Sequence, residues 1–259
     1  MRLSTVEQLL EHLDGVVARH ARGDRTSRES ADFWVQMLTT KGHPLNTALP
    51  DEPLVDWHER GLLGDLRGAS VLDVGCGNGR NAAWLAGHGA HVVGIDIAAP
   101  LLDVVRSTMP KGATLVPVDV LRDELPGGPF DLVYDSGCFH HLAPHRRITY
   151  LERVMPLVAE GGRFGIVTFA QEQQPSPNDT EVLVSGDTAG GTSFLLEDLA
   201  EIFGRHLHLV EARPVVAGRE GAFGADFLNA ALLSRPPQPG SRTISGSDHA
   251  DCSMGSMSL

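Results

Sequence analysis

The sequence predicts an α/β fold in which a doubly wound, mostly parallel sheet carries helices on both faces. Short runs of β-branched and apolar residues alternate with helical stretches, which is the pattern of parallel strands joined by crossover helices. The first of these runs breaks into three alternating glycines, Gly75, Gly77 and Gly79, and the next ends in an acidic residue, Asp96. Ligands of open parallel sheets bind beyond the carboxyl ends of the strands, so these residues indicate a ligand site at that edge.

We expect five strands before residue 170, at residues 70–74, 91–95, 114–118, 130–134 and 162–169. Helices are expected between them. The one at 144–157 has apolar residues at nearly helical spacing, and Glu160-Gly161-Gly162 is expected to close it. After a loop at 171–192, a helix at 195–203 precedes two further extended runs, at 206–216 and 223–234.

Composition restricts the class of protein. The chain has 259 residues and 42% hydrophobic residues, enough for one full core. Its formal net charge of -12 argues against nucleic-acid binding, which needs a basic surface, and favours a small-molecule substrate. No apolar run approaches the ~20 residues of a membrane span, and the first residues do not resemble a signal peptide. Three widely spaced cysteines (Cys76, Cys138 and Cys252) suit a reducing compartment, so we expect a cytoplasmic protein.

The glycine run predicts a cofactor loop. Glycine has no Cβ and lets a ligand approach the backbone closely, and the helix at 81–86 would point its free amides at that ligand. The spacing G-x-G-x-G differs from the G-x-G-x-x-G of dinucleotide sites. Asp73, two residues before Gly75, would repel a pyrophosphate but attract the ammonium group of an amino acid. This favours S-adenosylmethionine over NAD or FAD.

With these motifs, residues 29–235 resemble the class I S-adenosylmethionine-dependent methyltransferases. The resemblance implies that the glycine loop wraps the methionine part of the cofactor, that Asp96 binds both ribose hydroxyls, and that Asp119 and Val120 meet the adenine. A carboxylate can accept two hydrogen bonds from a vicinal diol, which suits the role of Asp96. The expected cofactor-binding residues are Trp34, Asp73, Gly75, Cys76, Gly77, Gly79, Asn81, Asp96, Ile97, Asp119, Val120, Asp135 and Ser136.

The same resemblance implies a Rossmann-like, seven-stranded methyltransferase sheet whose last strand is antiparallel, with an N-terminal helical lid. Residues 1–28 form a helix, at 4–20, and a linker; the helix either covers the cofactor site or simply packs on the domain or on a second subunit. Residues 29–235 form the methyltransferase domain. Residues 236–259 are rich in Ser, Gly and Pro, and we expect them to be disordered.

The loop after the fourth strand predicts the chemistry. It concentrates Asp135, Cys138, His140 and His141 beside the expected methyl group. Methyl transfer depends mainly on positioning, and a base is needed only if the acceptor must lose a proton. We expect Asp135, His140 and His141 as catalytic residues, with either histidine as the base. Cys138 is expected to pack rather than react, and the spacing of the Cys and His residues matches no structural zinc pattern, so no metal is expected.

More narrowly, this loop resembles that of the thiopurine, tellurite and thiol or halide methyltransferases. The resemblance rests on the run 134–139, on the Gly161-Gly162 pair and on Gly191-Thr192-Ser193-Phe194. Members methylate soft nucleophiles in a shaped, dry pocket. Trp34 is expected against the sulfonium of the cofactor or in the core. The expected substrate-binding residues are Phe33, Met37, Asn46, Phe139, His140, His141 and Arg147.

The sequence thus predicts a methyltransferase that transfers the methyl group of S-adenosylmethionine to a small molecule, in secondary metabolism or detoxification. Sulfur or nitrogen is the expected acceptor atom, and the protein is expected to be a monomer or homodimer that binds neither nucleic acid nor membrane. Two alternatives stay open. One is an oxygen or carbon methyltransferase of a natural product with a histidine base. The other is a non-methylating cyclase or regulatory protein on the same fold.

Overall fold

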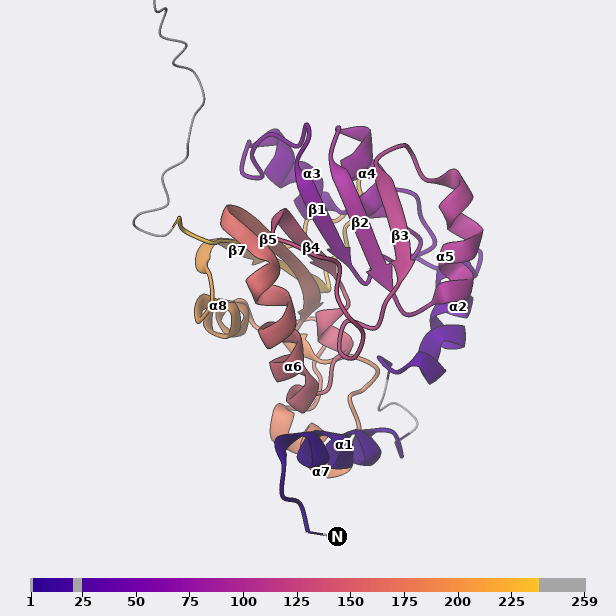
Figure 1. The fold of residues 1–259 in the computed structure, drawn as a ribbon, viewed down its shortest axis with the longest axis vertical. Coiled ribbons are helices and arrows are strands. Elements are labelled where there is room, and N and C mark those ends of the chain that lie inside the picture. The colour runs from indigo at the N-terminus through magenta and orange to yellow at the C-terminus, as the bar shows by residue number, and fades with distance from the viewer. Residues whose placement is uncertain (1, 21–24, 238–259) are drawn as a thin grey trace, which may run out of the picture.

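The computed structural model describes residues 2–20 and 25–237, so Cys252 and nearly all of the tail expected to be disordered lie outside the described residues. Its centre is one sheet of order β3-β2-β1-β4-β5-β8-β7, with the short β6 paired to β5 (Figure 1). The strands are β1 Ser70–Val74, β2 His91–Asp96, β3 Ala113–Pro117, β4 Phe130–Ser136, β5 Val158–Ala170, β6 Ser193–Phe194, β7 His208–Pro214 and β8 Leu228–Ser234.

Helices precede the sheet and join its strands. The α-helices are α1 Val6–Val17, α2 Ala31–Thr39, α3 Glu52–Glu59, α4 Arg80–Gly87, α5 Ala99–Val105, α6 Pro144–Val154, α7 Asp179–Ser185 and α8 Leu196–Gly204. Four single 3₁₀ turns lie at Arg28–Ser30, Arg106–Thr108, Phe139–His141 and Met155–Leu157.

The pairing of the strands confirms the predicted fold class. β1 pairs in parallel with β2 and β4, while β8 lies antiparallel between β5 and β7. The strand order reverses at β1, because β2 and β3 lie on one side of it and β4 and β5 on the other. Such a switch point opens a crevice at the carboxyl edge of the sheet, where ligands of doubly wound folds bind.

Both faces of the sheet are covered, which is why its central strands are mostly apolar rather than alternating with polar residues. On one face, Leu72 and Val74 belong to a core with residues of α6 and α8. On the other face, Val71 belongs to a second core with residues of α3, α4 and α5. Residues two apart in a strand point to the same face of a sheet. Asp73 therefore shares the face of Val71 in β1, and Asp135 shares the face of Val133 in β4. Because Val71 and Val133 belong to different cores, the two buried carboxylates point to opposite faces.

The boundary between α6 and β5 differs from the prediction. The helix ends at Val154, one 3₁₀ turn follows, and β5 begins at Val158 rather than at Gly162. Val158 pairs with Phe130, and the register then shifts before Arg163 pairs with Leu132. Gly161 lies inside this irregular part of the strand with φ of +77°, so it serves a β-bulge and not a helix end.

The two N-terminal helices have different positions. α1 lies beside α7 at the lower end of the molecule (Figure 1), and none of its residues lines the cavity described below. Asp14 of α1 accepts hydrogen bonds from His145 Nε2 at 2.8 Å and from Arg146 Nε at 2.9 Å on α6. α2 lies nearer the carboxyl edge of the sheet, and it contributes Phe33, Trp34 and other residues to the wall of a cavity there.

Candidate functional site

The candidate site is one cavity of about 510 Å³ at the carboxyl ends of β1, β2 and β4. One end lies against the glycine loop and the ends of β2 and β3, and the other is enclosed by α2, the loop after β4 and the segment before β8. Among the expected site residues, the wall contains Phe33, Trp34, Met37, Gly75, Cys76, Gly77, Asn81, Asp96, Ile97, Asp119, Val120, Ser136, His140 and His141.

The glycine loop is shaped by its own contacts. Gly75 has φ of +66°, and a Cβ at this position would lie 2.6 Å from the Cβ of Cys138, so only glycine fits between the two loops. Gly79 is the residue before α4, also with a left-handed backbone, and as glycine it has no side chain to cap the helix. The first amide of α4, that of Arg80, donates instead to Asn78 Oδ1 at 3.3 Å. Gly79 itself packs on Met109 and Leu115 and does not line the cavity.

Asp96, at the end of β2, is oriented by two backbone amides. The N–H of Gly77 donates to Oδ2 at 2.9 Å, and the N–H of Ala98 donates to Oδ1 at 2.8 Å. Burial raises the pKa of this carboxyl above its ordinary value, against the effect of these hydrogen bonds. Each oxygen keeps a lone pair, so a ribose diol in the cavity could be held by both.

Asp119, which follows β3, also lines the cavity, and both of its carboxylate oxygens accept hydrogen bonds from neighbouring residues. Oδ1 accepts from the N–H of Leu121 at 2.9 Å, and Oδ2 accepts from Arg122 Nη1 at 3.0 Å. Val120 lies next to it in the wall. The structure therefore places a carboxylate and an apolar side chain at the end of β3, with the carboxylate fixed by its neighbours.

Behind the glycine loop lies a buried polar cluster. Its members Asp73 and Asn81 were predicted site residues, whereas Asp51, Arg80 and Tyr134 were not. Asp51 Oδ1 lies 2.5 Å from Arg80 Nη1, and Oδ2 accepts from Asn81 Nδ2 at 3.0 Å and from the Tyr134 hydroxyl at 2.9 Å. Asp73 is buried close by, and its Oδ2 has no hydrogen-bond partner. Burial and the charge of Asp51 raise the pKa of Asp73 to about 8.

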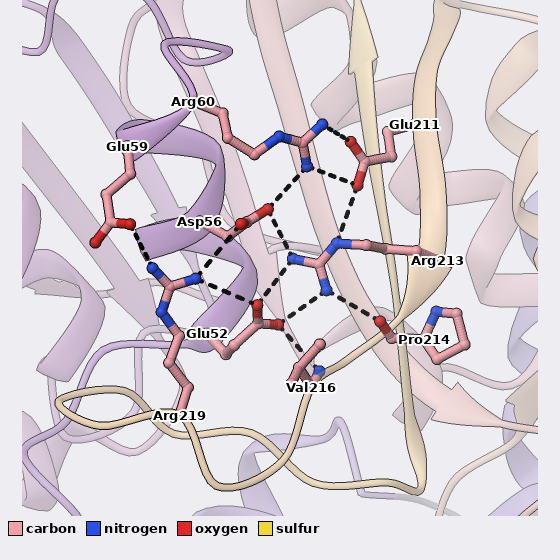
Figure 2. Close-up of polar contacts among 9 residues, drawn as sticks. All are labelled: Glu52, Asp56, Glu59, Arg60, Glu211, Arg213, Pro214, Val216 and Arg219. Atoms are coloured by element: carbon pink, nitrogen blue, oxygen red, sulfur yellow. Dashed lines mark hydrogen bonds and ion pairs between the residues drawn. The ribbon is translucent and has the colours of Figure 1, made fainter.

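The segment that closes the far side of the cavity is held by a network of charges. In Figure 2, the carboxylates of α3 surround Arg213 of β7 and Arg219 of the following loop. Arg213 Nη1 lies 2.9 Å from Glu52 Oε2, and the N–H of Val216 donates to the same oxygen at 3.1 Å. Glu52 in turn donates its N–H to the carbonyl of Phe223 at 2.7 Å, and Phe223 lines the cavity. The network therefore fixes one wall of the site.

The loop after β4 is organised by Asp135, which is fully buried and does not line the cavity. Its Oδ1 accepts from the N–H of Cys138 at 2.8 Å, and its Oδ2 accepts from the Tyr150 hydroxyl at 2.7 Å. Burial raises its pKa to about 6. The geometry gives Asp135 the role of shaping the loop, rather than the expected contact with cofactor or reacting atoms.

Three expected substrate-binding residues lie away from the cavity. Phe139 is fully buried in the core against Tyr150 and Phe203, because the single 3₁₀ turn directs it under the sheet. Arg147 is also buried, and it donates to Thr192 Oγ1 at 2.6 Å besides pairing with Asp179. Asn46 is exposed and donates to the carbonyl of Thr40. These contacts stabilise the protein around the site.

The two histidines line the cavity as a hydrogen-bonded pair. His141 Nδ1 lies 2.7 Å from the carbonyl oxygen of Gly190, and the Nε2 atoms of His140 and His141 are 3.0 Å apart. A carbonyl only accepts, so neutral His141 carries its proton on Nδ1 and accepts at Nε2 from the Nε2–H of His140. The remaining lone pair, on His140 Nδ1, is buried and has no partner.

Both histidines are neutral at physiological pH. Burial lowers the pKa of His141 to about 4, and the positive charge of Arg25 also lowers it. Burial lowers the pKa of His140 well below its ordinary value. His140 stacks on Phe169 with 3.9 Å between ring centroids, and the Trp34 ring meets His141 edge-on at 4.7 Å. Aromatic rings therefore hold the pair in place.

Trp34 and Phe33 connect α2 to the preceding segment. The Trp34 indole N–H donates to the carbonyl of Arg25 at 2.7 Å, and the guanidinium carbon of Arg25 lies 4.1 Å from the centroid of the Phe33 ring. Arg25, Arg80, Phe169 and Phe223 line the cavity but were not predicted. For Arg80 a signal was present, since it directly follows the last glycine of the loop; the other three lie in segments without a motif.

Two further features of the described part bear on the chemistry. Cys138 packs against Gly75, as expected, and burial raises the pKa of its thiol well above the ordinary value, which disfavours a thiolate nucleophile. Within residues 2–20 and 25–237, no group of three or more His, Cys, Asp or Glu side chains is arranged to hold a metal ion. No helix of the same residues has the length and apolar character of a membrane span.

Comparison with known proteins agrees with this geometry. Residues 71–162 match the family described as a methyltransferase domain. An uncharacterized methyltransferase of Mycobacterium tuberculosis is 38% identical over 100 residues, which cover 38% of this chain and 50% of the relative. A tRNA (carboxymethyluridine(34)-5-O)-methyltransferase of Xenopus tropicalis is 27% identical over 163 residues, 62% of this chain and 24% of the relative. The chain thus spans about half the length of the first relative.

Among solved structures, the 1,6-didemethyltoxoflavin-N1-methyltransferase of Burkholderia thailandensis has a TM-score of 0.56 and 22% identity. The match covers 91% of this chain and 92% of that protein, which was solved with 1,6-didemethyltoxoflavin and S-adenosylhomocysteine bound. At this identity the likeness shows the fold. Residues 71–162 are therefore similar to a methyltransferase domain, and the chain has the Rossmann-like fold of the solved methyltransferase structures.

Proposed function

We propose that this protein is an S-adenosylmethionine-dependent methyltransferase that acts on a small-molecule acceptor, with sulfur or nitrogen as the acceptor atom. One observation carries the proposal. A single cavity of about 510 Å³ joins the glycine loop and Asp96 to an aromatic end with His140 and His141. This volume lies in the range of ~300–1,000 Å³ typical of small-molecule sites. The cofactor and the acceptor would therefore share one enclosed space, as methyl transfer requires.

The cofactor end fits S-adenosylmethionine. Asp73 lies behind the cavity wall and has a buried oxygen without a hydrogen-bond partner, so it has no positive charge in direct contact; burial raises its pKa, although the charge of Arg80 lowers it. The ammonium group of the methionine part would supply that charge. At the end of β2, Asp96 presents two fixed oxygens to a ribose diol, and Asp119 with Val120 would meet the adenine. We assign the cofactor-binding roles to these residues and to Gly75, Cys76 and Gly77.

The acceptor end supports a nucleophile that needs no base. The hydrogen-bonded histidines are neutral, one Nε2 lone pair is used within the pair, and the other free lone pair is buried. A thiolate or an unprotonated aromatic nitrogen already carries the electron pair that attacks the methyl group. Such an acceptor needs a shaped pocket and correct alignment, which the rings of Phe33, Trp34 and Phe169 supply. This favours sulfur or nitrogen over the alternative with a histidine base.

A small molecule is favoured over the tRNA named for the Xenopus relative. That relative shares 24% of its length with this chain, and the net charge of -12 opposes binding to a polyanion. We also propose a cytoplasmic setting, in secondary metabolism or detoxification, and a monomer or homodimer. A non-methylating cyclase or regulator would share the cofactor site and differ in turnover.

The test combines binding and turnover. Calorimetric titration with S-adenosylmethionine, and with NAD as the control, measures cofactor choice. A product assay for S-adenosylhomocysteine then screens thiols, aromatic amines and N-heterocycles against phenols. Binding and turnover with thiols or nitrogen compounds support the proposal, turnover with phenols alone supports the oxygen alternative, and no binding of S-adenosylmethionine contradicts the proposal.

A further inference from the structure

The cavity wall contains one cation whose charge is not balanced by any described residue. Arg25 lines the cavity, and its Nε is buried without a hydrogen-bond partner. Within residues 2–20 and 25–237, its guanidinium forms no ion pair with a carboxylate. A buried donor of a charged group costs free energy when it is left unsatisfied, so such a group is expected to meet an acceptor in the working protein.

The other arginines near the cavity are satisfied. Arg80 also lines the wall, but it pairs with Asp51 at 2.5 Å and donates to the carbonyl of Leu49 at 3.1 Å. Arg147, under the same loop, pairs with Asp179 at 2.7 Å. Arg25 differs from them because its buried Nε–H has no acceptor among the described residues.

Arg25 is held in place by the groups beside it. Its guanidinium carbon lies 4.1 Å from the centroid of Phe33, and its carbonyl accepts the Trp34 indole N–H at 2.7 Å. A guanidinium stacked on a ring keeps its in-plane N–H donors available for a ligand. The charge acts on the acceptor end of the cavity, since it lowers the pKa of His141.

The surroundings of this charge are flat and aromatic. Phe33 meets Trp34 edge-on at 5.1 Å, Trp34 meets His141 at 4.7 Å, and His140 stacks on Phe169 at 3.9 Å. Such walls favour a planar ring as the ligand, because ring contacts add to the burial of apolar area.

We propose that Arg25 is the anion-binding residue of the acceptor site, and that the acceptors are planar aromatic compounds that carry an anionic group. The inference rests on the proposed function and narrows its substrate class. The inference agrees with the neutral histidine pair, because an acceptor that is already an anion needs no base. The negative charge of such an acceptor does need a positively charged partner in the desolvated cavity.

The experiment uses matched aromatic probes with the full-length protein saturated with S-adenosylhomocysteine. Benzoate, 2-naphthoate and indole-3-carboxylate are each titrated against the corresponding amide by calorimetry. The wild type is expected to bind at least one carboxylate about tenfold more tightly than its amide, the effect of one charge-assisted contact. Arg25→Gln is expected to abolish this preference. Arg28→Gln, which removes a neighbouring exposed arginine paired with Asp123, is the matched control and is expected to retain it.

The outcomes separate this inference from the proposed function. Failure of S-adenosylhomocysteine to bind would contradict the proposed function. With S-adenosylhomocysteine bound, equal affinity for carboxylates and amides, or no binding of any probe, would overturn the role of Arg25. The role would also be overturned if Arg25→Gln kept the carboxylate preference but lost affinity for S-adenosylhomocysteine, because Arg25 would then serve the cofactor.

Discussion

Asp51 and Arg80 form an ion pair inside the protein, with 2.5 Å between Oδ1 and Nη1. Asp51 precedes α3, while Arg80 opens α4 directly after the glycine loop. The pair therefore joins the start of α3 to the glycine loop that lines the cavity. Because Asp51 also accepts from Asn81 and Tyr134, its carboxylate is the centre of this junction.

Removing this carboxylate should destabilise the protein and loosen the loop. Asp51→Asn leaves the guanidinium of Arg80 without its buried partner, and we expect a loss of about 3 kcal/mol in the free energy of unfolding. Chemical denaturation measures it. Glu201→Gln, which breaks the exposed pair of Glu201 with Arg205, is the control and should cost less than about 0.5 kcal/mol. Equal effects of the two substitutions would contradict the role of Asp51.

The raised pKa of Asp73 predicts a dependence of stability on pH. Its folded-state value of about 8 lies above the unfolded value, so between these values the native state binds more protons than the unfolded state, and stability falls as pH rises. The raised pKa of Asp135 also makes stability fall as pH rises, but only up to about pH 6. The lowered pKa values of the histidines change stability only below about pH 6.5, the ordinary pKa of histidine.

The window from pH 7 to 8 therefore isolates Asp73. We expect the free energy of unfolding of the wild type, without cofactor, to fall by about 1 kcal/mol more over this window than that of Asp73→Asn. Denaturation curves at pH 7.0, 7.5 and 8.0 provide the comparison. Parallel pH profiles of the two proteins would show that Asp73 ionises normally.

The histidine pair should tolerate substitution in a way that a catalytic base does not. His140→Gln and His141→Gln are expected to retain the shape of the wild-type pH–rate profile and to lower kcat by less than about tenfold, through looser packing of the acceptor. A general base contributes ~10²–10⁴-fold. A drop of that size with a lost pH dependence in either variant would establish the alternative with a histidine base.

Asp96 should determine cofactor affinity. Asp96→Ala removes the acceptor of the Gly77 and Ala98 amides and the proposed acceptor of two ribose hydroxyls, so the Kd for S-adenosylmethionine should rise by about 10- to 100-fold. Asp119→Ala, at the next strand end, is the comparison and should have the smaller effect on Kd, because on the cofactor side only the adenine amino group would lose its partner, while Leu121 and Arg122 would each lose a hydrogen bond within the protein. An unchanged Kd in Asp96→Ala would refute the ribose assignment.

The sequence by itself predicted the fold class and the edge of the sheet at which the cavity lies. Strand periodicity and the glycine run are local signals, because a strand must bury both faces and a tight turn needs φ above zero at Gly75, whatever lies elsewhere in the chain. These signals located β1 and β2 and the carboxylates at their ends. They misplaced the junction of α6 and β5, because Gly161 serves a bulge whose partner, β4, is distant in sequence.

Only the tertiary structure decided which side chains line the aromatic end of the cavity. Phe139 and Arg147 share a loop and helix with the histidines, but packing under the sheet takes both away from the cavity. His141 meets a carbonyl 49 residues further along the chain, and this contact fixes which nitrogens carry protons in the pair. Arg25 lies in the wall beside α2, where its carbonyl accepts the indole N–H of Trp34. The hydrogen bonds and the burial of these side chains depend on residues that are distant in sequence. The spacing of residues within one segment therefore could not predict them.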